Sequence, residues 1–192
     1  MMQKAGGKME YRTRVSFVWN YEKDEQWMTD LSAQGLHLVK PGIVRSRFEK
    51  DTDRRYVYKV DYHQLKKGEE LKSYLALFED MGWEHVSSYM GWHYFRKPYA
   101  EGESYEIYTD RTTIIQLWKR VQTTFLMILL ANIPILILNL VNMFETADRS
   151  EVISSTIASV SGFQTTVALL LLYGWFRFQN KIKQLSTDSP QG

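Results

Sequence analysis

Side chains able to transfer protons are scattered along this sequence. The 192 residues include four histidines and no cysteine. The sequence contains no P-loop, dinucleotide-binding fingerprint, nucleophile elbow or zinc-binding helix motif, so the main signatures of enzymes and metal sites are missing. An enzyme acting on a lipid or a membrane-proximal substrate stays an alternative, with acid–base groups drawn from Asp61, Glu84, His85 and His93. We expect no catalytic residue, no metal ligand and no cofactor.

Aromatic side chains offer a second kind of chemistry, the recognition of a ligand or a partner. Rings recur along the expected strands, and basic residues close to them could anchor a polar group. Packing in the domain core is the competing explanation, because large side chains fill the space between helices and a sheet. The predicted ligand or partner surface consists of Tyr56, Tyr58, Tyr62, Trp83, Trp92, Tyr94, Arg96 and Lys97.

Charge and composition exclude several classes of partner. A formal net charge of +2, without a dense stripe of Lys and Arg, provides no electrostatic surface for nucleic acid. The absence of cysteine excludes a disulfide framework and fits a reducing compartment. The first residues lack the apolar stretch of a secretory signal, so we expect residues 1–10 to form a flexible cytosolic tail.

Two long apolar segments predict a transmembrane hairpin that anchors the chain in the lipid bilayer. No charged residue interrupts Phe125 to Phe144 or Ile157 to Phe176. About 20 such residues in a helix span the hydrocarbon layer, whereas a soluble core helix rarely stays uncharged for so long. We place the spans at 121–144 and 157–178, with an extracytoplasmic loop at 145–156 and a cytosolic tail at 179–192.

The distribution of basic residues predicts that both termini lie in the cytosol. Lys and Arg near the ends of a span are retained on the cytosolic side. The loop holds only Arg149 as a basic residue, and it also carries Glu145, Asp148 and Glu151. The basic residues on the other side of the hairpin are Lys119, Arg120, Arg177, Lys181 and Lys183. We therefore expect a multi-pass protein of the bacterial cell membrane.

Polar and small residues within the spans predict helix contacts. Amide side chains are costly in lipid, so Asn132 and Asn139 should hydrogen-bond within the hairpin or in an oligomer. Ala158, Gly162 and Thr166 recur at every fourth position and form a ridge that another helix can approach closely. We expect the first span to contact this ridge, and we expect the hairpin to associate with a protein partner or a second copy.

Residues 11–98 switch between strand and helix periodicity, which predicts one small cytosolic α+β domain. Amphipathic helices are expected at 22–34 and 67–81, each followed by a glycine, Gly35 or Gly82. Strands are expected at 12–19, 36–50, 54–62, 83–89 and 92–97, with a hairpin around Asp51–Asp53 and a break at Pro41–Gly42. This order predicts a ferredoxin-like split βαβ sandwich. Residues 99–120 should form a linker and a juxtamembrane helix.

Several segments of this domain resemble domain-of-unknown-function family 2812. The similarity covers about residues 12–110 and is most specific at Gly82-Trp83-Glu84 and Tyr94-Phe95-Arg96-Lys97. It also involves residues 27–35, 56–62, 74–83 and 91–97. Members are typically membrane proteins of Gram-positive bacteria, often encoded near PadR-type transcriptional regulators. The resemblance thus implies a regulatory or sensory setting, but no catalytic residue and no ligand.

We expect the function to lie in binding. The leading hypothesis is a membrane-anchored cytosolic sensory or adaptor module that binds a protein or a small ligand. The alternative is an accessory subunit of a membrane transport or export complex, because the spans carry asparagines and a small-residue ridge. The apolar segments Phe125 to Phe144 and Ile157 to Phe176 contain no charged residue, which argues against a pore.

Overall fold

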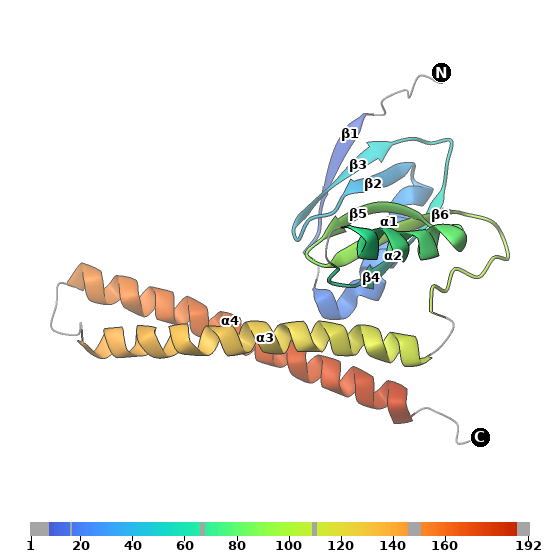
Figure 1. The fold of residues 1–192 in the computed structure, drawn as a ribbon. Helices are drawn as coiled ribbons and strands as arrows, with labels where there is room; N and C mark the ends of the chain where they lie inside the picture. Colours follow the sequence, from blue (N-terminus) through green and yellow to red (C-terminus); the bar gives the residue numbers. More distant parts are fainter. Residues whose placement is uncertain (1–7, 16, 66–67, 109–110, 146–150, 188–192) are drawn as a thin grey trace. The chain divides into compact units, whose positions relative to one another are not determined.

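The computed structural model describes residues 8–15, 17–65, 68–108, 111–145 and 151–187 (Figure 1). The chain divides into two compact units, which we call the α+β unit (Met1–Thr109) and the helical unit (Asp110–Gly192). The predicted fold class, an α+β domain followed by two long apolar helices, is confirmed. Most of the predicted N-terminal tail, the loop residues Asp148 and Arg149, and the last five residues lie outside the described residues.

The first half of the α+β unit consists of three strands and a helix. Strand β1 is followed by a short 3₁₀ helix, helix α1 and a hairpin of β2 and β3, and the antiparallel sheet has the order β1-β3-β2. The bounds are β1 Met9–Thr13, η1 Val18–Asn20, α1 Tyr21–Ala33, β2 Leu36–Lys40 and β3 Arg45–Lys50.

The second half of the unit has the same composition of elements. Strand β4 is followed by helix α2 and a hairpin of β5 and β6, and this antiparallel sheet has the order β4-β6-β5. The bounds are β4 Tyr56–Tyr62, α2 Glu69–Asp80, β5 Glu84–Tyr89 and β6 Trp92–Pro98. The strands that one ferredoxin-like sheet would contain are therefore divided between two sheets.

The two halves repeat one βαββ arrangement. Both helices are followed by a glycine with positive φ, Gly35 at 76° and Gly82 at 80°, which stand 82 − 35 = 47 positions apart. This backbone conformation favours glycine and ends a helix. The same spacing separates Phe48 of β3 from Phe95 of β6, and both side chains are fully buried.

Strand pairing repeats as well. The hairpin of β2 and β3 has a register shift between Leu38 and Lys40, and the hairpin of β5 and β6 has one between His85 and Ser87. These positions are also 47 residues apart. Equivalent residues of the two halves can therefore be compared position by position.

The predicted hairpin around Asp51–Asp53 is wrong. Strands β3 and β4 lie on either side of it but belong to different sheets, and β4 pairs with β6. Apolar alternation determines which face of a strand is buried, but it does not determine the neighbouring strand. Pro41–Gly42 does separate two strands, β2 and β3, which pair with each other. The first strand lies earlier than predicted, since β1 ends at Thr13.

Helix α1 covers the outer edge of β4. Three side chains on one side of the helix accept backbone N–H groups of the strand. Ser32 Oγ accepts from Tyr56 at 2.7 Å, Thr29 Oγ1 from Tyr58 at 3.1 Å, and Glu25 Oε1 from Val60 at 2.9 Å. An uncovered edge strand would present these donors to another chain, so α1 closes this edge of the second sheet.

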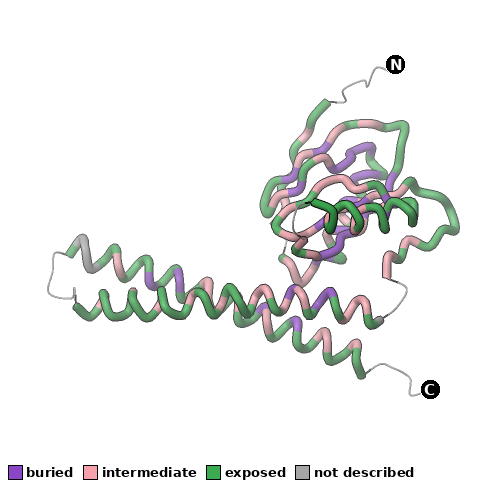
Figure 2. Tube along the Cα trace, in the orientation of Figure 1, coloured by how far each residue is buried: buried purple, intermediate pink, exposed green. Residues whose placement is uncertain are grey.

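The helical unit consists of α3 (Arg111–Glu145) and α4 (Glu151–Thr187). Both helices are long and apolar enough to cross a membrane by length and composition. Phe178 of α4 packs between Trp118 and Phe125 of α3, with ring centroids 5.4 and 4.9 Å apart. Most other described residues of these helices are exposed (Figure 2).

Candidate functional site

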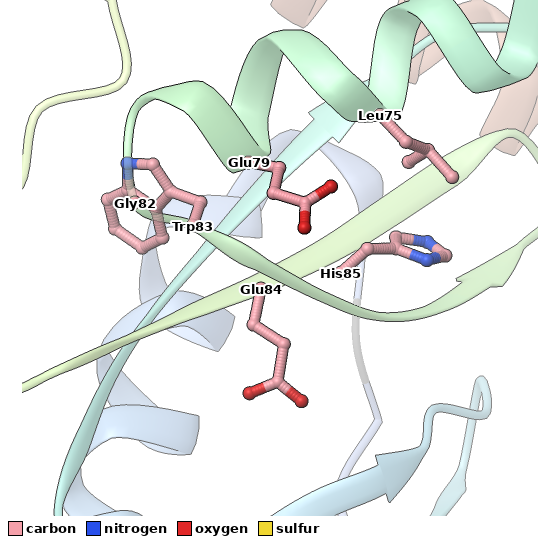
Figure 3. Close-up of a pocket in the computed structure, with 6 residues that line it drawn as sticks. All are labelled: Leu75, Glu79, Gly82, Trp83, Glu84 and His85. Carbon is pink, nitrogen blue, oxygen red and sulfur yellow. The ribbon is translucent and has the colours of Figure 1, made fainter.

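A cleft of about 440 Å³ lies between α2 and β5 (Figure 3). Gly82 turns the chain directly from the helix into the strand, so the last turns of α2 face the start of β5. Leu75 and Glu79 are four residues apart and therefore share a face of the helix. The lining combines apolar and ionisable side chains: Leu75, Glu79, Gly82, Trp83, Glu84 and His85.

Hydrogen bonds connect this cleft to the buried face of the second sheet. His85 Nε2 lies 2.9 Å from Ser88 Oγ, which lies 2.9 Å from Nδ1 of the buried His93. His93 Nε2 lies 3.0 Å from the carbonyl oxygen of His63, so Nε2 carries a hydrogen and donates it to this oxygen. The Ser88 hydroxyl has a single hydrogen, so it donates to at most one of the two imidazoles beside it.

Asp61 is the acceptor in a neighbouring buried cluster. The Tyr74 hydroxyl donates to Asp61 Oδ2 at 2.7 Å, and the Tyr108 hydroxyl donates to Oδ1 at 2.5 Å. The ring of Tyr74 also packs against the rings of His63 and His93, at centroid distances of 5.3 and 5.0 Å. The carboxylate and the histidine chain are therefore joined through Tyr74.

The electrostatics of these groups follow from burial. Burial lowers the pKa of His85, and the adjacent His93 lowers this pKa further, so the His85 imidazole is neutral at pH 7. Burial and the charge of Asp61 raise the pKa of Tyr108 above its ordinary value, so the phenol stays protonated and donates. In the described part of the chain, no group of three or more His, Asp or Glu side chains is placed to hold a metal ion.

The predicted aromatic surface divides into buried and half-buried residues. Tyr56, Tyr58, Tyr62 and Trp83 are buried, and Trp92, Tyr94, Arg96 and Lys97 are half-buried. Tyr58 has no exposed area, and its hydroxyl accepts the Leu38 N–H at 3.0 Å. Of the eight predicted residues, Trp83 lines the cleft.

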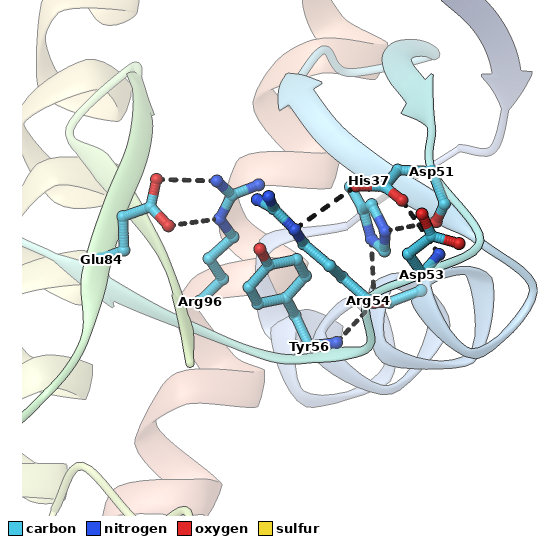
Figure 4. A network of polar contacts seen from close by, with 8 residues as sticks. His37, Asp51, Asp53, Arg54, Tyr56, Glu84 and Arg96 are labelled. Atoms are coloured by element: carbon cyan, nitrogen blue, oxygen red, sulfur yellow. Dashed lines mark hydrogen bonds and ion pairs between the residues drawn. The ribbon is translucent and has the colours of Figure 1, made fainter. Parts of the chain in front are cut away.

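The two predicted basic anchors already have acidic partners. Arg96 donates to both carboxylate oxygens of Glu84 at 2.7 and 2.8 Å, and its guanidinium lies 4.5 Å above the Tyr56 ring (Figure 4). Lys97 Nζ lies 2.5 Å from Glu103. Glu79 is therefore the cleft carboxylate that remains for a ligand, since Glu84 is held by Arg96.

His37 belongs to a separate network that joins elements of the fold (Figure 4). Its Nε2 lies 2.8 Å from the Asp51 carbonyl oxygen, and its Nδ1 lies 3.1 Å from Ser32 Oγ. Ser32 also accepts the Tyr56 N–H, so the imidazole links α1, β2 and the start of β4. Burial lowers the pKa of His37, which keeps the ring neutral and suited to this structural role.

The structure brings one of the two predicted asparagines into contact between α3 and α4. Asn139 Nδ2 donates to Gln164 Oε1 at 2.5 Å, and Gln164 Nε2 donates to the carbonyl oxygen of Asn132 at 3.3 Å. The side chain of Asn132 instead bonds its own helix, at the Ile128 carbonyl. Gln164 is thus the central polar residue between the two helices.

The small-residue ridge lies outside this helix contact. Ala158, Gly162 and Thr166 are exposed, and a Cβ added at Gly162 would meet no atom within 4 Å. Ser161 and Gln164 occupy the buried positions of this part of α4. The expected contact of the ridge with α3 is therefore not formed, and the ridge is free for a different helix.

Sequence patterns missed the roles of Tyr74, Tyr108 and Ser88 in the buried clusters. Tyr108 lies beyond residue 98, where the domain was predicted to end, and Tyr105 and Ile107 also pack against the core that contains Trp83. The segment 99–108 therefore belongs to the α+β unit. The sequence does not single out Ser88, because a serine within a strand indicates no function until the residues around it in the fold are known.

Comparison with known proteins supplies a family. The family described as "Protein of unknown function (DUF2812)" matches residues 20–130, more than half of the chain. The chain belongs to this family. The DUF2812 match begins just before α1, includes the cleft and both buried clusters, and ends within α3. No curated protein and no solved structure matches the chain.

Proposed function

We propose that this DUF2812 protein is a membrane-anchored sensory or adaptor module whose α+β unit lies in the cytosol. Helices α3 and α4 support the anchor, because their length and composition suit a bilayer. The cleft between α2 and β5 supports binding as the activity. A sensor of this kind needs no reaction at the site.

The composition of the cleft indicates the chemistry of the ligand. Leu75 and Trp83 supply apolar walls, the neutral His85 supplies a polar nitrogen, and the exposed Glu79 supplies a negative charge. This combination suits a small amphipathic amine, whose cation would meet Glu79 while its apolar part contacts the walls. The adjacent Ser88–His93 chain would then connect ligand contact at His85 to the sheet interior.

Thermal unfolding of the purified full-length chain in detergent tests this proposal. A panel of alkyl and aromatic amines should contain compounds that raise the melting temperature of the wild type, since a ligand at 100 times its Kd stabilises by about 2.7 kcal/mol. Glu79→Gln and His85→Gln should remove this shift, whereas the exposed Glu101→Gln should retain it. A panel that shifts no melting temperature, together with a pull-down that captures no protein, would contradict the proposal.

The exposed ridge of α4 favours a second candidate, an accessory subunit of a membrane transport or export complex. Ala158, Gly162 and Thr166 form a surface that α3 does not use, and small residues permit close approach of a helix in lipid. Native mass spectrometry of the chain extracted in mild detergent should then show a co-purifying membrane protein. Gly162→Leu should release it, and a strictly monomeric chain would argue against this candidate.

A further inference from the structure

The two halves of the α+β unit differ in whether a helix supplies hydrogen-bond acceptors to the free edge of their first strand. In the second half, the outward N–H groups of β4 are bonded by Glu25, Thr29 and Ser32 of α1. Positions 47 residues later on α2 carry Lys72, Ala76 and Glu79, and all three are exposed. The second helix therefore does not present the acceptor row that α1 presents.

The equivalent edge of β1 is open. Arg14 N–H donates to the Val44 carbonyl at 2.9 Å and Lys50 N–H to the Lys8 carbonyl at 3.0 Å, so even-numbered residues of β1 bond to β3. The N–H and C=O groups of Met9, Tyr11 and Thr13 consequently point away from the sheet. The Tyr11 carbonyl accepts from the guanidinium of the adjacent Arg12 at 3.2 Å, and among the described residues we find no other hydrogen-bond partner for these backbone groups.

We propose that the open edge of β1 pairs with β1 of a second copy of this chain, antiparallel and centred on Tyr11. This register makes Tyr11 face its own counterpart and pairs Met9 with Thr13 by backbone hydrogen bonds. It also places Glu10 of each copy opposite Arg12 of the other, in the closely spaced pairs where side chains meet. Two new ion pairs thus form across the two-fold axis.

The charges of β1 favour this register over its neighbours. A shift by two residues in one direction sets Glu10 against Glu10, and a shift in the other direction sets Arg12 against Arg12. Within one chain, Glu10 and Arg12 already form an ion pair of 2.7 Å, so both charged groups lie on the same face of the strand. Their arrangement is complementary to itself only when the strands are antiparallel around Tyr11.

The ends of the paired strands and their exposed face agree with the same arrangement. The centred register brings Lys8 opposite Arg14, but Arg14 is turned toward α1, where it pairs with Asp24 at 3.2 Å. Met9 and Tyr11 are 48% and 51% exposed, and a second copy would cover part of this apolar area. Three paired residues per strand make a weak interface, which a shared membrane would strengthen by concentrating the copies.

Cysteine crosslinking of the full-length chain tests the pairing directly. The protein contains no cysteine, so a single introduced thiol has no background. Residues opposite each other in such a pair have Cα atoms about 5.5 Å apart, within the range that a disulfide bridges. Under mild oxidation in membranes, Tyr11→Cys should form dimers about tenfold faster than Met90→Cys, which is 70% exposed elsewhere in the unit. Equal rates for the two variants would overturn the proposal.

Two further changes separate this interface from any contact through the helices. Tyr11→Pro removes an outward N–H that β3 does not use, so β1 stays in its sheet while pairing with the second copy is lost. Glu10→Arg should weaken the dimer, and the exchange Glu10→Arg with Arg12→Glu should restore it. Light scattering in detergent measures the mass in each case. A dimer that survives Tyr11→Pro, or that only Gly162→Leu disrupts, would assign self-association to another surface.

Discussion

Glu25 is a carboxylate that the fold buries because a strand edge needs its oxygen. Its Oε1 accepts the Val60 N–H at 2.9 Å, and its Oε2 lies 3.1 Å from Lys59 Nζ. Burial raises the pKa of Glu25 to about 7, although Lys59 and the backbone bond act in the opposite direction. The side chain thus combines a structural contact with titration close to neutral pH.

Glu25→Gln should change how stability depends on pH. The folded-state pKa of about 7 lies above the ordinary value of 4.5, so between these values the folded state retains a proton that the unfolded state has released. Wild-type stability relative to the variant is therefore greatest below pH 4.5 and falls as the pH rises through 7, by roughly 3 kcal/mol. Thermal unfolding of both proteins in detergent, followed by tryptophan fluorescence across this pH range, measures the difference.

In the difference between the wild type and Glu25→Gln, the contributions of other titrating groups to stability cancel. The lowered pKa of His37 acts in the opposite direction, because its contribution to stability is lost as the pH falls through the unfolded-state value, and this effect is common to both proteins. Glu101→Gln, at an exposed carboxylate, should show no comparable pH-dependent difference. A wild-type advantage over Glu25→Gln that stays constant with pH would contradict the burial of an ionisable carboxyl group.

Residue types indicated the participants in the buried clusters, but they did not reveal the connections between them. Asp61, His85 and His93 were recognised as the ionisable groups of interest, and the structure links the two histidines through Ser88. No spacing rule could place Asp61 beside Tyr108, because this contact joins residues 47 positions apart and depends on the path of the chain after Pro98. Side-chain chemistry is local in sequence, whereas these contacts are not.

The elements themselves were predicted better than their pairing. Helix α1 begins and ends within one residue of the predicted 22–34, and α2 lies inside the predicted 67–81. Gly35 and Gly82 mark the C-terminal ends of these two helices. The last two predicted strands, 83–89 and 92–97, also correspond to two strands that pair, β5 and β6. The repeat was missed because its halves share few identical residues, although the glycines and Phe48 and Phe95 all recur at the same spacing.

Thr29→Val tests whether α1 holds the edge of β4. Valine has the shape of threonine but offers no acceptor, so the Tyr58 N–H would be buried without its partner at 3.1 Å. An unsatisfied buried donor costs about 1–3 kcal/mol, and the melting temperature of the full-length chain in detergent should fall accordingly. Thr13→Val, at an exposed threonine of β1, should change stability by less than about 0.5 kcal/mol. Equal effects of the two changes would show that the helix is not needed to satisfy this edge.

At the scale of the whole molecule, apolar length predicted the helical unit and local charge predicts its orientation. The spans at 121–144 and 157–178 lie within the longer helices α3 and α4, and the predicted juxtamembrane segment is continuous with α3. Helix α3 runs without interruption from the juxtamembrane residues into the predicted span, so the helix is longer than its apolar segment. Packing was harder to predict, because Ser161 and Gln164 rather than the small-residue ridge occupy the buried side of α4.

Single cysteines should show that both ends of the hairpin lie in the cytosol. Five basic residues flank the two apolar segments at the ends away from the loop, and only Arg149 is a basic residue of the loop. Since basic residues are retained on the cytosolic side, the loop should face outward. A membrane-impermeant maleimide should then label Glu145→Cys in intact bacterial cells, while Met90→Cys and Ser186→Cys should react only after the membrane is permeabilised. Labelling of Met90→Cys in intact cells with protection of Glu145→Cys would reverse the topology, and it would also place the α2–β5 cleft outside the cell.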